Sequence, residues 1–118
     1  MTGSVPTREV RGTVRFREAV PAPATVHVHL DEVSRADAEA TPVAELILPL
    51  AGSLPAGAEL AFAIIAPAIE ERDRYAVRVH VDVSGTGEVE VGDLLSTSAY
   101  PVLTQGAPDD VTVEAHLI

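Results

Sequence analysis

The sequence of 118 residues contains no cysteine, no tryptophan and no lysine. Without cysteine, the chain cannot form disulfides, thiolate zinc sites or a cysteine nucleophile. Without tryptophan, it lacks the aromatic platform on which a glycosidase with paired carboxylates would hold a sugar. Only two Phe and two Tyr are present, so the core must be built mainly from Val, Leu, Ile and Ala. No apolar run reaches the length of a membrane span.

Positive charge is also scarce. Arginine supplies all 8 basic residues against 18 acidic ones, and the net charge is −10. Such a chain is a poor binder of nucleic acid or of an anionic membrane surface. Residues 1–12 contain no apolar signal segment and no cysteine that could accept a lipid. The expected location of the chain as given is therefore cytoplasmic, and its length predicts a single domain over residues 1–118.

Strict alternation of apolar and polar residues dominates the chain. In residues 25–33, Val26, Val28 and Leu30 alternate with His27 and His29, which is the period of a half-buried strand. No long helical pattern interrupts these segments. The sequence therefore predicts an all-β fold, a single antiparallel seven-stranded β-sandwich of immunoglobulin-like or transthyretin-like type, with a barrel as the alternative. The seven predicted strands are residues 9–17, 25–33, 43–50, 58–65, 75–83, 94–103 and 111–117.

Two packing expectations follow from the same alternation. Residues from three different strands should share one core, namely Val28, Leu30, Phe62, Val79 and Val81. Gly12 interrupts an apolar face in the first predicted strand. A glycine at such a position indicates a bulge or a close approach of the backbone to a neighbour.

Several motifs along the chain occur in the order found in one known family. The first set consists of Val10, Gly12, Val14, Arg17, Pro21, Ala24, Leu30, Glu32, Val33, Ser34, Ala36, Asp37 and Ala38. Residues 75–78 (Tyr-Ala-Val-Arg) and 97–106 (TSAYPVLTQG) continue the pattern. Together they resemble the YbaY-type lipoproteins and the type III secretion lipoprotein chaperones of the YscW kind, or pilotins.

That resemblance implies a small immunoglobulin-like β-sandwich with a non-enzymatic role in protein binding or assembly. Family members are typically exported lipoproteins, whereas this sequence lacks the lipidated cysteine. We expect no catalytic residues, because the serines lie in no nucleophile-elbow motif. We also expect no cofactor. The expected partner is another protein. A metal- or small-ligand-binding protein is the alternative function.

That alternative depends on three histidines. His27 and His29 are two residues apart and therefore share a strand face. If residues 25–33 and 75–83 pair, His80 lies across from them, with Asp31 and Asp82 nearby. Imidazoles and a carboxylate suit Zn²⁺, Cu²⁺ or Ni²⁺. The other interpretation, which we favour here, is that all three are outward-facing polar residues that bind no metal.

An acidic segment offers a second candidate metal site. Asp31, Glu32, Asp37 and Glu39 could supply oxygens to Ca²⁺, although they lack the EF-hand spacing. A solvated turn over residues 34–40, capped by Ser34, is the interpretation that the sequence favours.

Residues 43–50 are apolar on both faces of the predicted strand. Only one face can pack into the core, which leaves Val43 and Ile47 on the other. Pro42 and Pro49 at the ends are typical of an edge strand. We therefore expect Val43 and Ile47 to form a docking or homodimer surface, unless residues 34–40 or 67–74 fold over it.

Overall fold

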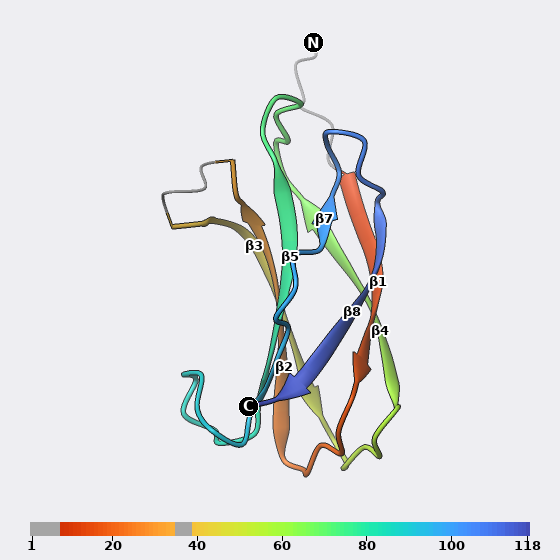
Figure 1. Cartoon of the computed structure of the whole chain (residues 1–118), viewed down its shortest axis with the longest axis vertical. Helices are drawn as coiled ribbons and strands as arrows, with labels where there is room; N and C mark the ends of the chain where they lie inside the picture. The colour runs from red at the N-terminus through yellow and green to blue at the C-terminus, as the bar shows by residue number, and fades with distance from the viewer. Residues whose placement is uncertain (1–7, 35–38) are drawn as a thin grey trace.

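The computed structural model describes residues 8–34 and 39–118, and these residues form an all-β fold (Figure 1). No helix in the described part of the chain is long and apolar enough to cross a bilayer. The strands are β1 (Arg8–Phe16), β2 (Ala24–Glu32), β3 (Thr41–Leu50), β4 (Glu59–Ala66), β5 (Tyr75–Asp82), β6 (Leu94–Leu95), β7 (Pro101–Val102) and β8 (Asp110–Leu117).

The strands form one sheet in the order β3-β2-β5-β6-β8-β1-β4, and β7 pairs with β5. The β1–β8 pair is parallel, while the other pairs are antiparallel. The two ends of the order, β3 and β4, approach each other without pairing, so the sheet nearly closes into a barrel.

The all-β prediction is thus confirmed, but the predicted seven antiparallel strands are not, and the sheet is closer to the barrel alternative than to a clear sandwich. The structure has eight strands in one mixed, barrel-like sheet. Alternation shows which residues face inward, but it does not encode the partner or the direction of a strand. Residues 94–103 also divide into two short strands, and Pro101 begins the second of them.

The predicted core is confirmed. Its five residues, Val28, Leu30, Phe62, Val79 and Val81, are all buried within one apolar cluster.

Gly12 makes the close approach that the sequence predicts. It pairs with Phe62 of β4, whose ring lies over the glycine backbone. A Cβ at position 12 would lie 2.4 Å from Cζ of Phe62 and 2.6 Å from the carbonyl oxygen of Val111. Only glycine fits at this position of β1, between the neighbouring strands β4 and β8.

Candidate functional site

The three candidate histidines lie side by side on one sheet face. Strands β2 and β5 are antiparallel neighbours, and His27 pairs directly with His80. The ring of His27 stacks on those of His29 and His80, with centroid separations of 6.2 and 5.7 Å. The predicted shared face is therefore confirmed.

His80, however, is covered and not exposed to solvent, and that part of the prediction is wrong. It is only 4% exposed, and its Nε2 lies 2.8 Å from Oδ2 of Asp93. Residues 83–93, which we call the 83–93 loop, leave β5 and return Asp93 to this position just before β6. Sequence reasoning missed Asp93, because its place depends on the path of that loop.

The Asp93 carboxylate is fully buried and closely surrounded by donors. The backbone N–H groups of Val83, Ser84 and Glu90 donate to it over 2.9 to 3.1 Å, in addition to His80. Burial by itself raises the pKa of this carboxyl group. The hydrogen bonds from His80 and the three backbone groups outweigh burial and lower the pKa to about 2.

Asp82 completes the same arrangement at the start of the loop. Its carboxylate accepts the N–H groups of Gly85 and Gly87, both at 2.9 Å, and the hydroxyl of Ser84 at 3.0 Å. Burial opposes ionisation, but these donors leave the pKa of Asp82 lowered. Possible ligand atoms of His80, Asp82 and Asp93 lie within 4.8 Å of one another. We call these three residues the His80 cluster.

Every carboxylate oxygen of the His80 cluster already accepts at least one hydrogen bond from the protein. A metal ion would have to displace those donors and leave buried N–H groups unpaired, which is costly. The cluster is therefore built to anchor the 83–93 loop.

His27 and His29 belong to a second group, which we call the His27 cluster together with Glu45 of β3. Glu45 pairs with His29, and its Oε2 lies 3.6 Å from Nδ1 of His27 and 3.4 Å from Nδ1 of His29. The side chains of both histidines are 19% exposed and that of Glu45 is 44% exposed. Burial, followed by the positive charge of Arg78, lowers the pKa of His29. Sequence reasoning also missed Glu45.

The acidic segment does not converge on a calcium site within the described residues. Asp31 is buried and pairs with Arg78 at 3.0 Å, while Glu32 accepts the N–H of Ser34 at 2.6 Å. Glu39 is exposed, and Asp37 lies outside the described residues.

The predicted cap by Ser34 likewise concerns residues 35–38, which lie outside the described residues. Its hydroxyl oxygen accepts the N–H of Arg74, at 2.9 Å. Ser34 thereby links the end of β2 to the residue that precedes β5.

The predicted partner strand is an edge strand, as expected, because β3 ends the sheet order. Ile47 is 53% exposed. Val43, in contrast, is half-buried against the core, beside a register shift in the β2–β3 pairing. Because of this irregularity, Val43 and Ile47 do not point to the same exposed face, as simple alternation would predict. The two residues therefore do not form one exposed surface.

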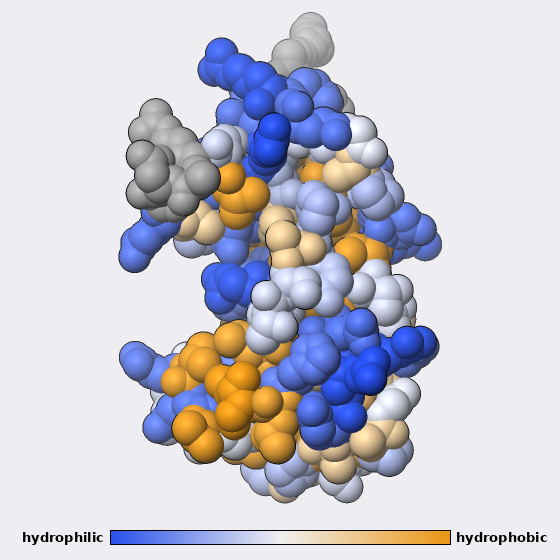
Figure 2. Space-filling view, in the orientation of Figure 1, coloured by the Kyte–Doolittle hydropathy of each residue, from blue (hydrophilic) through white to orange (hydrophobic). Residues whose placement is uncertain are grey.

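A larger apolar surface lies elsewhere. Figure 2 shows an apolar area where the 83–93 loop and the C-terminus lie in Figure 1. The exposed residues there are Val89, Val91, Leu117 and Ile118, which we call the C-terminal apolar patch. Backbone hydrogen bonds join Ile118 to Gly92 and Asp93, at 2.9 and 3.0 Å. The sequence does not reveal this patch, because its two parts are far apart along the chain.

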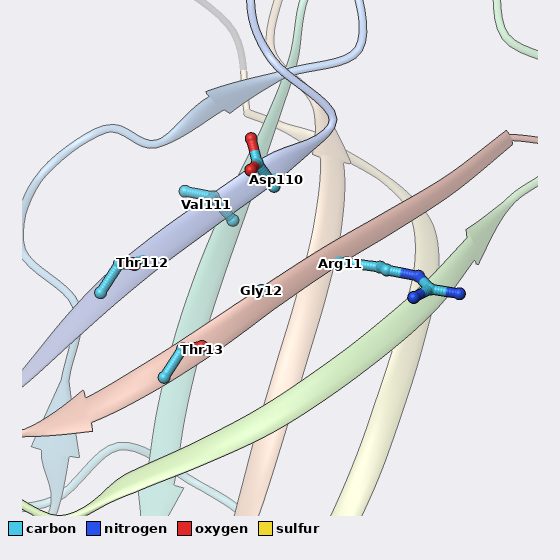
Figure 3. A pocket seen from close by; sticks show the side chains of 6 residues that line it. All are labelled: Arg11, Gly12, Thr13, Asp110, Val111 and Thr112. Carbon is cyan, nitrogen blue, oxygen red and sulfur yellow. The ribbon is translucent and has the colours of Figure 1, made fainter.

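A shallow pocket of about 430 Å³ lies between β1 and β8 (Figure 3). Gly12, which has no side chain, stands at its centre, and Arg11 points away from it toward β4. The pocket brings no buried polar side chain to a ligand, so it is a weak candidate for a binding site.

Comparison with known proteins supports the resemblance seen in the motifs. The family model described as "Type III secretion system lipoprotein chaperone (YscW)" matches residues 5–115. The chain belongs to the YscW family. No curated protein matches the chain significantly.

A solved structure agrees with the YscW assignment. It is described as an alternative pilotin from the type II secretion system of Vibrio cholerae. The match has 28% sequence identity and a TM-score of 0.78, and covers 96% of this chain and 98% of that one. The YscW family is described as one of lipoprotein chaperones, whereas no cysteine that could carry a lipid is present among these 118 residues. The cytoplasmic location stays a prediction.

Proposed function

We propose that this protein is a non-enzymatic assembly module that binds a segment of a secretion-system protein. The observation that carries this proposal is the family match over residues 5–115, together with a pilotin structure that covers nearly the whole of both chains. The His80 cluster also supports a non-enzymatic role, because its groups are occupied in holding a loop.

The docking surface that we propose is the unpaired edge of β3, which approaches β4 without pairing with it. An edge strand has backbone N–H and C=O groups that an extended segment of another chain can pair with. Ile47 adds an exposed apolar side chain at the middle of that edge. The net charge of −10 favours a partner segment that carries positive charge, because complementary charge speeds association.

The test measures binding of the full chain to each soluble secretion-system component of the same organism. We expect one component to bind, and Ile47→Glu to weaken that complex at least about tenfold by burying a charge. Ile65→Glu is the matched control, because Ile65 is also 53% exposed but lies on the other edge strand, β4. If no component binds the wild-type chain, the assembly role is wrong.

The C-terminal apolar patch is the second candidate surface, favoured by the 92% exposure of Val91. Val91→Glu belongs in the same experiment. Loss of binding in Val91→Glu, with Ile47→Glu unaffected, would move the docking site to this patch. Sedimentation of the free chain tests self-association, and a dimer that Ile47→Glu dissociates would make β3 a homodimer edge.

A further inference from the structure

We propose that His27, His29 and Glu45 form a binding site for a divalent transition-metal ion, with Zn²⁺ as the reference ion. This site differs from the histidine trio that the sequence suggests, because the structure pairs His80 with Asp93 and brings Glu45 to the other two histidines. It is independent of the proposed assembly role.

The separations between the ligand atoms carry the inference. Zinc bonds to imidazole nitrogen and carboxylate oxygen place neighbouring ligand atoms of a tetrahedral site about 3.3–3.5 Å apart. Oε2 of Glu45 lies 3.4 and 3.6 Å from the two Nδ1 atoms, and all three atoms fall within 4.8 Å of one another. These separations exceed those of a good N–H···O hydrogen bond. Two of the three separations thus match those of a tetrahedral zinc site, and a turn of the nearly parallel imidazole rings would aim both Nδ1 atoms at one ion.

The ligand set is also available and chemically selective. Among the described residues, the Glu45 carboxylate has no ion-pair partner besides the two imidazoles. Two imidazoles and one carboxylate suit Zn²⁺, Cu²⁺ or Ni²⁺, whereas Ca²⁺ and Mg²⁺ need more oxygens. The partial exposure of all three side chains leaves a fourth position for water.

Arg78 places a positive charge close to this position, and the carboxylates of Glu45 and Asp31 act in the opposite sense. Arg78 pairs with His29 across β2 and β5, but its guanidinium bonds to the buried carboxylate of Asp31 at 3.0 Å. Asp31 therefore offsets the positive charge closest to the site.

The location of the site gives metal binding a structural consequence. His27 and His29 lie on β2, whereas Glu45 lies on the edge strand β3. A bound ion would link these strands beside Ile47, which pairs with His27. Slower amide hydrogen exchange in β3 is therefore expected when metal is bound.

The experiment titrates the purified full chain with Zn²⁺ by calorimetry, at neutral pH and in a buffer that does not bind zinc. We expect one ion per chain with a Kd of about 1 μM or tighter, and at least a tenfold loss for His29→Ala and for Glu45→Gln. His116→Ala is the matched control, because His116 lies on β8, outside the cluster. The Zn²⁺ affinity of this variant should stay within about twofold of the wild-type value. Circular dichroism without metal checks that each variant is folded.

A second measurement does not depend on any variant. In nitrogen-detected NMR of the wild-type imidazoles, Zn²⁺ should shift the ring nitrogens of His27 and His29, and leave the His80 Nε2 that faces Asp93 unchanged. Absence of binding by the wild-type chain would overturn the proposal. Binding that shifts only His80 or His116, or that survives His29→Ala unchanged, would overturn it as well.

Discussion

Two histidine–carboxylate groups lie on the same sheet face and differ in almost every physical respect. In the His80 cluster the carboxylates are buried and each oxygen accepts a hydrogen bond from within the protein. In the His27 cluster the Glu45 carboxylate is 44% exposed, and it lies beyond good hydrogen-bond distance from both imidazoles. One group is complete without a ligand, whereas we propose that the other binds one.

The difference shows that proximity of ligand residue types does not by itself define a metal site. Both clusters bring three suitable atoms within 4.8 Å. What separates them is whether the lone pairs are already used. A saturated carboxylate stabilises the fold, and an unsaturated one remains available for binding.

Removing the buried carboxylate is expected to have the largest effect. Asp93→Ala leaves three backbone N–H groups and His80 without their buried acceptor, so we expect a loss of about 3–5 kcal/mol in the free energy of unfolding. Urea denaturation measures this loss. Glu45→Ala is the control from the other cluster, and equal losses in the two variants would contradict the distinction between them.

The stability that the buried Asp93 carboxylate contributes should depend on pH. The pKa of Asp93 is lowered to about 2 in the folded state, below the ordinary value of 3.8 for an aspartate. The ionised carboxylate therefore contributes stability above about pH 4, and this contribution, roughly 2 kcal/mol, is lost as pH falls toward 2. Unfolding free energies between these pH values should fall less steeply in Asp93→Asn. An identical slope in the variant would show that Asp93 does not carry the effect.

A smaller loss of stability is expected when the Ser84 hydroxyl, which lies between the carboxylates of the His80 cluster, is removed. Oγ of Ser84 donates to Asp82 at 3.0 Å and lies 3.5 Å from Asp93. Ser84→Ala should cost about 1 kcal/mol in chemical denaturation, as expected for one hydrogen bond. Ser98→Ala, at an exposed serine outside the cluster, should be close to neutral. A neutral Ser84→Ala would mean that the loop is held by its backbone donors alone.

The smallest change in stability is expected in the His27 cluster. Without metal, Glu45→Gln should alter the free energy of unfolding by less than about 1 kcal/mol, because the carboxylate is half-exposed and has no short hydrogen bond. With Zn²⁺ present, the wild-type melting temperature should rise and that of Glu45→Gln should not. A large loss without metal would place Glu45 among the structural carboxylates.

Local alternation was enough to predict much of this molecule. The inward residues of β2 and β5, such as Val28 and Val79, and the shared face of His27 and His29 follow from the two-residue period of any strand. The sequence predicted that Gly12 would lie at a bulge or close to a neighbour, because a glycine leaves a gap in an apolar strand face that a neighbouring group can occupy. The partner that fills it, Phe62, required the β1–β4 register.

Asp82 was expected near His80, but the carboxylates of Asp93 and Glu45 could not be predicted in this way. Asp93 reaches His80 because the 83–93 loop turns back on itself, and Glu45 reaches His29 because β3 pairs with β2 in one particular register. The parallel β1–β8 pairing and the near closure of the sheet depend on similar long-range choices. Side-chain alternation is a property of neighbouring residues, whereas strand partners and loop paths are selected by the free energy of the whole packed chain.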